Sequence, residues 1–222
     1  MHTRLPSRLV PCSPLTTCLA VLLIAIASTA RAQAKTDRLI DQPAFDVLTL
    51  DKANDNKVLK IYPLPLPGRR VPENPKASES LRIKLLDTSE EFDVAWLHVA
   101  KLQLFEELVM AEASKLASEG NFDEAYQYLT FLSNYYPTTP GLPEARQSFL
   151  YLSAGAAFKQ KKYEEALAVL EELLTLNPQY RASDSAPPLL QVLGSILEPM
   201  LAECLERQDF RTIRTLLARI SK

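Results

Sequence analysis

The sequence predicts a mainly α-helical protein in which a small antiparallel β unit precedes the helices. Apolar residues recur with a helical period from about residue 101 to residue 222, whereas they alternate with polar residues between about 43 and 100. Within the helical region, the sequence also repeats itself at an offset of 41 residues. Repeats of about 20 to 50 residues are typical of stacked supersecondary units.

Residues 1–34 have the features of a secretory signal peptide. Two arginines precede the apolar run 18–27, and small residues follow it at alternate positions, so we expect cleavage after Ala32 or Ala34. An uncleaved anchor is the alternative, but the apolar run is well short of the ~20 residues that span a bilayer. A lipoprotein signal fits less well, because Cys18 begins the apolar run and does not end it.

Removal of the signal changes the composition that bears on function. The net charge is −2 for the full chain, and the mature chain keeps 22 basic and 27 acidic residues, a net charge of −5. This mild acidity argues against nucleic-acid binding, which needs a clustered basic face. Cys204 and His98 are the only cysteine and histidine left, too few for a structural zinc site, and no nucleophile motif lies near His98. The five glycines are too scattered for a phosphate-binding loop. We therefore expect no cofactor, no metal and no enzymatic activity.

Residues 35–100 predict a small four-stranded antiparallel unit, with a partial barrel as one arrangement. Its four strands are expected at 45–50, 58–62, 81–85 and 92–96. A Pro-rich arm, 63–75, separates the two strand pairs, and its five prolines in thirteen residues favour an extended conformation that wraps across the unit. Arg69 and Arg70 at the tip of the arm are candidates for binding an anion, but we expect them to lie in a solvated turn.

The helical region 101–222 contains aligned copies of one pattern. The segment 120–125 has the sequence Gly-Asn-Phe-Asp-Glu-Ala, and the segment 161–166 has the sequence Lys-Lys-Tyr-Glu-Glu-Ala. The same offset of 41 aligns Ala113 with Ala154, Leu129 with Leu170, Leu132 with Leu173 and Pro137 with Pro178. A third, weaker copy follows at an offset of 47, with Gln208, Phe210, Ile213, Leu217 and Ile220.

These residues resemble the tetratricopeptide repeat (TPR), whose pattern has a small residue, then Gly-x-aromatic-x-x-Ala, then a closing proline. The matching positions are Ala113, Gly120, Phe122, Ala125 and Pro137 in the first copy, and Ala154, Tyr163, Ala166 and Pro178 in the second. Lys161 replaces the glycine of the second copy. The resemblance implies an α-α hairpin solenoid of about three repeats, at 106–139, 147–180 and 194–222. The segment 131–140 is similar to exported bacterial repeats of the outer-membrane-assembly lipoprotein and cell-division-coordinator kind.

Steric reasoning supports the same arrangement. Two antiparallel helices cross closely where Ala113 meets Ala125, and larger side chains there would force them apart. In the third copy Leu201 and Ile213 replace both small residues. The offsets of 41 and 47 exceed the ~34 residues of the family, so the helices that start near Pro143 and Pro187 are expected to be longer than usual.

The resemblance also implies a binding surface, because the first helices of TPR hairpins line a concave groove that takes peptides or partner helices. The implied positions are Glu107, Met110, Ser114 and Ala117, then Ser148, Tyr151, Gly155 and Phe158, then Ser195, Glu198, Ala202 and Leu205. The Lys/Asn pattern that clamps a C-terminal carboxylate in chaperone-binding relatives is absent, so Met110, Tyr151 and Phe158 are the candidate anchors. The alternative is that these residues pack against the β unit or the linker of the same chain.

Three hypotheses for function follow. In the first, the protein is an exported, non-catalytic adaptor that binds a protein or peptide through the groove, in the periplasm or, alternatively, outside the cell. In the second, it is the amino-terminal recognition module of a longer exported transporter component or enzyme. In the third, it is an enzyme that uses acidic residues. No nucleic-acid partner and no membrane span in the mature chain are expected, and the open C-terminal repeat allows a homo-oligomer.

The repeat assignment predicts a large effect of the substitution Ala125→Glu. A longer, charged side chain at a close helix crossing combines overpacking with a buried charge, so we expect the free energy of unfolding to fall by several kcal/mol. Thermal or urea denaturation followed by circular dichroism measures this change. Melting like that of the wild type would contradict the assignment.

Overall fold

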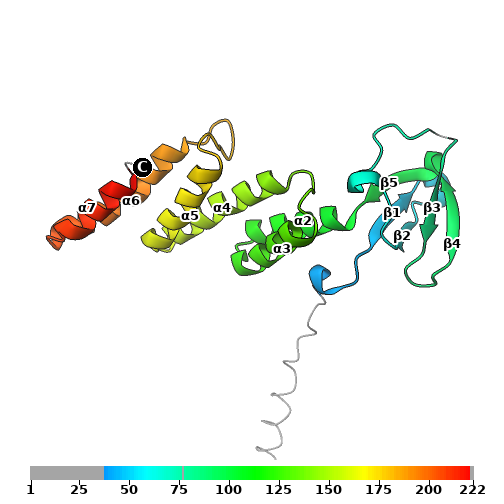
Figure 1. Cartoon of the computed structure of the whole chain (residues 1–222), viewed down its shortest axis with the longest axis horizontal. Helices are drawn as coiled ribbons and strands as arrows, with labels where there is room; N and C mark the ends of the chain where they lie inside the picture. Colours follow the sequence, from blue (N-terminus) through cyan, green and yellow to red (C-terminus); the bar gives the residue numbers. More distant parts are fainter. Residues whose placement is uncertain (1–37, 77, 221–222) are drawn as a thin grey trace, which may run out of the picture. The chain divides into compact units, whose positions relative to one another are not determined.

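A computed structural model describes residues 38–76 and 78–220, so the predicted signal peptide and its cleavage positions lie outside the described residues. The described residues fall into two compact units, one up to Gln42 and one from Pro43 onward. The first unit contributes the short helix η1 (Leu39–Asp41), across which Arg38 and Asp41 form an ion pair of 2.8 Å. The second unit holds the β unit and the α-helices (Figure 1).

The β unit has five strands in the described part of the chain, one more than the sequence predicts. They are β1 (Asp46–Leu50), β2 (Val58–Ile61), β3 (Ser80–Lys84), β4 (Glu91–Ala95) and β5 (Val99–Gln103). The strand order is β2-β1-β5 in one sheet, and β3 and β4 form a separate hairpin; all pairs are antiparallel. A bridge between Ile61 and Leu85 joins the two parts.

The additional strand β5 lies where the sequence predicts the helical region to begin. Leu102 of β5 stands opposite Leu48 of β1 in the register, and both side chains are buried. The alternation with period two therefore continues through Leu104, which is also buried, and the helical period starts only at Phe105. Because Leu102 is the only buried residue of β5, the alternation in this strand is faint in the sequence.

The core of the β unit includes the Pro-rich arm. Leu64 of the arm is 3 % exposed, and Leu66 and Val71 pack against the same core as partly buried side chains. Burial of a leucine or isoleucine contributes about 2 kcal/mol each, so these contacts hold the arm on the sheets. The buried core residues are Leu48, Ile61, Leu64, Leu81, Ile83, Leu102 and Leu104.

The tip of the arm does not form a solvated turn around Arg69, and this corrects the expectation from the sequence. Arg69 ends the short helix η3 (Pro67–Arg69), and its Nη2 lies 2.7 Å from Oδ1 of Asp46 and 2.8 Å from Oε2 of Glu106. Its Nη1 donates to the carbonyl of Leu64 at 2.9 Å. Arg70, in contrast, is exposed. We call Arg69, Asp46 and Glu106 the Arg69 cluster.

The carboxylates of the Arg69 cluster are buried and fully hydrogen-bonded. Asp46 is 0 % and Glu106 is 2 % exposed. Asp46 also accepts the backbone N–H groups of Leu64, at 2.8 Å, and of Phe105, at 2.9 Å. Partial burial alone would lower the pKa of Arg69, but the hydrogen bonds from its guanidinium to the two carboxylates raise that pKa above its usual value. The cluster thus joins the arm, β1 and the first α-helix through charge-assisted hydrogen bonds.

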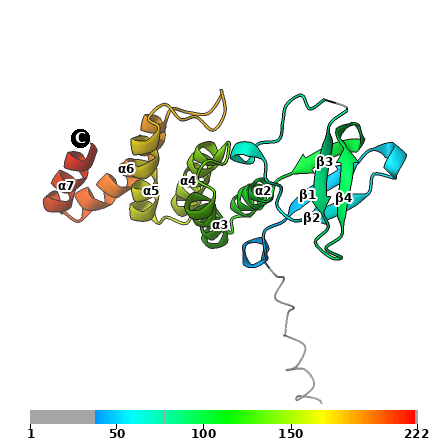
Figure 2. The same cartoon turned by 45° about the vertical axis from the view of Figure 1, so that its right-hand side comes forward.

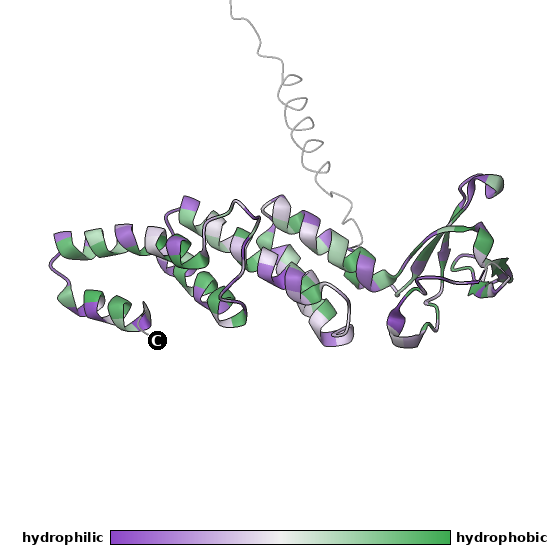
Figure 3. Cartoon of the chain, turned by 90° about the horizontal axis from the view of Figure 1, so that it is seen from above, coloured by the Kyte–Doolittle hydropathy of each residue, from purple (hydrophilic) through white to green (hydrophobic). Residues whose placement is uncertain are grey.

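The helical region consists of three antiparallel hairpins, which pack against one another in chain order (Figures 1 and 2). Apolar and hydrophilic residues alternate along its helices (Figure 3). This arrangement confirms the predicted fold class. The helices are α2 (Phe105–Ser118) and α3 (Phe122–Tyr135), α4 (Leu142–Lys159) and α5 (Tyr163–Leu176), and α6 (Leu189–Glu206) and α7 (Phe210–Ile220).

The residues of the repeat pattern lie at the helix crossings and at the helix ends. The four alanines of the two crossings, Ala113, Ala125, Ala154 and Ala166, are at most 1 % exposed. The aromatic residues of the pattern, Phe122 and Tyr163, are the first residues of α3 and α5. Pro137 and Pro178 follow the ends of these helices by two residues. The helices α4 and α6 have 18 residues, against 14 in α2, α3 and α5, as the longer offsets predict.

The turn inside each hairpin has a left-handed backbone at one equivalent position. Gly120 has a φ of 85°, and the residues at offsets of 41 and 47, Lys161 and Gln208, have φ values of 61° and 55°. Glycine adopts this conformation readily, whereas a residue with a Cβ does so at a cost of about 1 kcal/mol. The glycine of the repeat pattern therefore serves the turn, and Lys161 adopts the same conformation without being a glycine.

The Arg69 cluster predicts a strong effect of the substitution Arg69→Met. Removal of the guanidinium leaves two buried carboxylates without their counterion, so we expect the free energy of unfolding to fall by about 3 kcal/mol. The neighbouring Arg70→Met is the matched control and should change it by at most about 0.5 kcal/mol, because Arg70 is exposed. Urea denaturation of both variants measures the difference. Equal stabilities would show that the cluster does not hold the arm.

Candidate peptide-binding groove

A small pocket lies between α4 and α6, the first helices of the second and third hairpins. Its volume is about 150 Å³. Ala154 and Ile196, which are 1 % and 2 % exposed, belong to its wall, and Phe158, which is 36 % exposed, stands at its edge. The full lining consists of Ala154, Gly155 and Phe158 from α4, and Pro187, Gln191, Val192, Ser195 and Ile196 from α6 and the residues before it.

The chemistry of this pocket is apolar. None of its eight lining residues is charged, and the hydroxyl of Ser195 donates to the carbonyl of Gln191 in the same helix at 3.1 Å. An apolar cavity of this volume holds about one benzene-sized group. The pocket is therefore suited to one uncharged apolar side chain of a partner, and none of its side chains could act as a general acid or base.

Of the twelve implied groove positions, the structure brings three into this pocket, Gly155 and Phe158 of α4 and Ser195 of α6. Gly155 and Phe158 line it, and the ring of Phe158 also packs on Tyr163 with centroids 5.8 Å apart. Tyr151 lies on the same helix outside the pocket, half-buried, with its ring 5.8 Å from that of Tyr180. The contact with Tyr180 belongs to the chain's own linker after α5, as the alternative interpretation of the sequence allows.

The four implied groove positions of α2 lie outside this pocket, and the carboxylate of Glu107 accepts the backbone N–H of Leu104 at 3.2 Å. Met110 is half-buried, and its side chain lies beside the turn at Gly141. Ser114 is exposed and donates its hydroxyl to the carbonyl of Met110 at 3.0 Å. Ala117 is 5 % exposed and is part of the apolar core, so its side chain does not line an open surface.

Sequence reasoning missed the far wall of the pocket, where Pro187 and Val192 lie. The stripe on α6 that the TPR resemblance implies contains Ser195 but neither of these residues. The signal that could have identified the wall is the pair of prolines at 187 and 188, which positions the start of α6 after a long linker.

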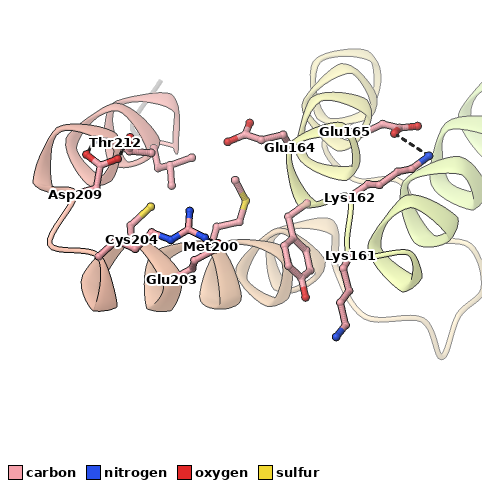
Figure 4. A pocket seen from close by; sticks show the side chains of 12 residues that line it. Lys161, Lys162, Glu164, Glu165, Met200, Glu203, Cys204, Asp209 and Thr212 are labelled. Atoms are coloured by element: carbon pink, nitrogen blue, oxygen red, sulfur yellow. Dashed lines mark hydrogen bonds and ion pairs between the residues drawn. The ribbon is translucent and has the colours of Figure 1, made fainter.

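A second pocket, of about 520 Å³, differs in its chemistry (Figure 4). It is bordered by the start of α5, by the last turns of α6, where Met200, Glu203 and Cys204 lie, and by Asp209 and Thr212 (Figure 4). Several of its charges are paired: Lys162 lies 3.6 Å from Glu165, and Arg207 pairs with Glu203. Because these charged groups already have partners, this pocket is less suited than the apolar one to capture a side chain.

His98 has a structural contact in the β unit. Its Nδ1 lies 3.0 Å from Oδ2 of Asp51, and the backbone N–H of Asp51 donates to the carbonyl of His98 at 2.8 Å. The hydrogen bond with His98 lowers the pKa of Asp51 below its usual value. The pair thus links the loop after β1 to the short helix η4 (Trp96–His98).

Two general features complete the description of the surface. In residues 38–76 and 78–220, no three histidine, cysteine, aspartate or glutamate side chains are grouped so that they could hold a metal ion. None of the helices in this part of the chain combines the length and the apolar character that a membrane span requires.

Comparison with known proteins gives one match. Residues 105–217 match the family model YfiO, described as an outer membrane lipoprotein. The matched region begins at the first residue of α2 and ends within α7, so it coincides with the three helical hairpins and leaves out the β unit. No curated protein and no solved structure matches the chain.

Proposed function

Because the chain belongs to the YfiO family of outer membrane lipoproteins, we propose that it is an exported, non-catalytic TPR scaffold that binds a protein or peptide partner between α4 and α6. The observation that carries this proposal is the uncharged pocket of about 150 Å³ on the surface that TPR hairpins use for binding. Its size and lining favour a partner that inserts one apolar side chain. Phe158 at its edge, still 36 % exposed, would gain apolar contact area on binding.

The neighbouring residues extend the proposed site along α4. Tyr151 precedes Gly155 by four residues and Phe158 by seven, so the three lie on one stripe of the helix. Leu152, which is 39 % exposed, adds apolar surface beside this stripe. An extended or helical segment of a partner that anchors in the pocket would therefore continue over Tyr151. Met110 and Ser114 of α2 remain candidates for contacts beyond that point.

We place the mature protein in the periplasm, with secretion as the alternative. The family description indicates the cell envelope, and the basic, apolar and small-residue segments of 1–34 indicate export. The expected cleavage after Ala32 or Ala34 leaves no cysteine at the new N-terminus, and Cys204 lies inside α6. We therefore propose that this member reaches its place in the envelope through protein contacts and carries no N-terminal acyl chain.

The pocket predicts opposite outcomes for two matched glycine substitutions. A Cβ at Gly155 of α4 or at Gly194 of α6 meets no atom within 4 Å, so neither site clashes with the first carbon of a side chain. Gly155→Leu fills the pocket and should abolish capture of the partner, whereas Gly194→Leu, outside the pocket, should preserve it. Both should raise the free energy of unfolding by about 0.8 kcal/mol, because leucine favours a helix more than glycine does.

Affinity capture from an envelope extract, with mass spectrometry of the bound proteins, measures this effect. The double substitution Tyr151→Ala and Phe158→Ala should also lose the partner, and Tyr135→Ala is its control, because Tyr135 is 71 % exposed on α3 and lies outside the pocket. If the Gly155→Leu variant captured the same proteins as the wild type, the proposed site would be wrong.

The processing proposal predicts the intact mass of the mature protein. Purified from the cell envelope, the protein should have the mass of the unmodified chain that starts at residue 33 or 35. Mass spectrometry distinguishes this result from a chain that starts at Cys18 and carries acyl groups. Detection of the acylated form would overturn the proposed processing and leave the groove proposal unaffected.

A further inference from the structure

The last hairpin presents an apolar surface to which no other described residue is bound. Leu205 of α6 and Phe210 and Leu217 of α7 are 59 %, 59 % and 52 % exposed. Arg214 lies between Phe210 and Leu217 on the same side of α7, one helical turn from each. Glu198 lies on the stripe of α6 that contains Leu205, seven residues earlier. We call Glu198, Leu205, Phe210, Arg214 and Leu217 the end face.

The end face can be compared with the equivalent residues of the second repeat. In the second copy, at an offset of 47, Leu170 corresponds to Leu217 and Leu167 corresponds to Arg214. Both of these leucines are 0 % exposed. They lie on α5, which packs against α4 of its own hairpin and against α6 of the next. The end face therefore has the position of a stacking surface, and within this chain such a surface is covered by a helical hairpin of the same kind.

The end face differs from its counterpart by its charges. Arg214 stands where Leu167 stands in the second copy, and Glu198 stands where Tyr151 stands. Both side chains are exposed, and neither forms an ion pair with another residue in the described part of the chain. The surface thus carries one base and one acid beside three apolar side chains, so it is complementary in charge to a second copy of itself.

The end face is held in a fixed position on the hairpin. Leu216, on the opposite side of α7, is 1 % exposed. Arg219 pairs with Glu171 of α5 at 2.8 Å and with Glu164 at 3.1 Å. These contacts fix the orientation of α7, so its exposed side is already arranged for binding in the free protein, and little conformational entropy is lost when it binds.

From these observations we propose that the end face binds the end face of a second copy, forming a two-fold symmetric dimer. In such a dimer Arg214 of each copy pairs with Glu198 of the other, and Phe210 and Leu217 are buried between the two α7 helices. Such a contact is between identical surfaces, so it closes at two copies.

This proposal does not depend on the groove between α4 and α6. None of the residues that line that pocket belongs to the end face, so the Gly155→Leu variant should dimerise like the wild type. A wild-type protein that captures a partner but does not dimerise would contradict only the dimer. A wild-type protein that dimerises but captures no partner would contradict only the groove.

Sedimentation equilibrium of the mature protein over a wide concentration range tests the dimer. We expect a monomer–dimer equilibrium that Leu217→Glu weakens at least about tenfold, because it places a charge in an apolar contact. Leu190→Glu is the matched control: Leu190 is 70 % exposed on α6 and lies outside the end face, so the equilibrium should not change. Circular dichroism should show native helix content in both variants.

A charge exchange tests the orientation of the two copies. Arg214→Glu and Glu198→Arg should each weaken the dimer by about tenfold, because each places like charges together, and the double variant should restore it. A wild-type protein that remains monomeric up to the highest concentrations, or a Leu217→Glu variant that dimerises like the wild type, would overturn the proposal. Failure of the double variant to recover would overturn the paired arrangement of Arg214 and Glu198.

Discussion

The guanidinium of Arg69 joins three segments that the sequence places far apart. It binds Asp46 in β1 and Glu106 in α2, and both carboxylates are buried. Burial of two acids and one base is unfavourable unless the hydrogen-bonding capacity of all three is met, and here it is met in part by backbone N–H groups. One of these is the N–H of Phe105, the first residue of α2, so Asp46 fixes where the solenoid begins. The second hairpin packs on the first, and the third packs on the second.

Along the solenoid, the size of two residues in each hairpin determines how closely its helices pack. Alanines occupy the crossings of the first two hairpins, whereas Leu201 and Ile213 occupy that of the third and remain half-buried. Among the residues of α7 whose side chains the structure describes, only Leu216 is fully buried. Two openings, of about 520 and 590 Å³, adjoin this helix. The larger side chains at the third crossing accompany a looser packing of α7 on α6 than that of the helices in the first two hairpins.

The features that the sequence predicts correctly have local causes. Ala125 must be small, Phe122 must begin a helix and Pro137 must follow one, and each requirement is met within a few residues of the chain. The features that it fails to predict depend on distant partners. Arg69 is separated from Asp46 by 23 residues and from Glu106 by 37, so nothing in the arm indicates an ion cluster. For the same reason the sequence does not indicate Pro187 and Val192 as part of the pocket, since the path of the linker before α6 depends on contacts such as that of Asn177 with Gln147, 30 residues apart.

The left-handed residues in the three turns have a consequence for the order in which the hairpins open. Gly120 adopts its conformation without strain, whereas Lys161 and Gln208 hold equivalent conformations that a side chain disfavours. The strain is released when a turn unfolds, so the second and third hairpins have a lower free energy of local opening than their packing alone would give. The first hairpin has no such strain and is joined to the β unit. Local opening should therefore cost less free energy at the turns of the second and third hairpins than at the turn of the first.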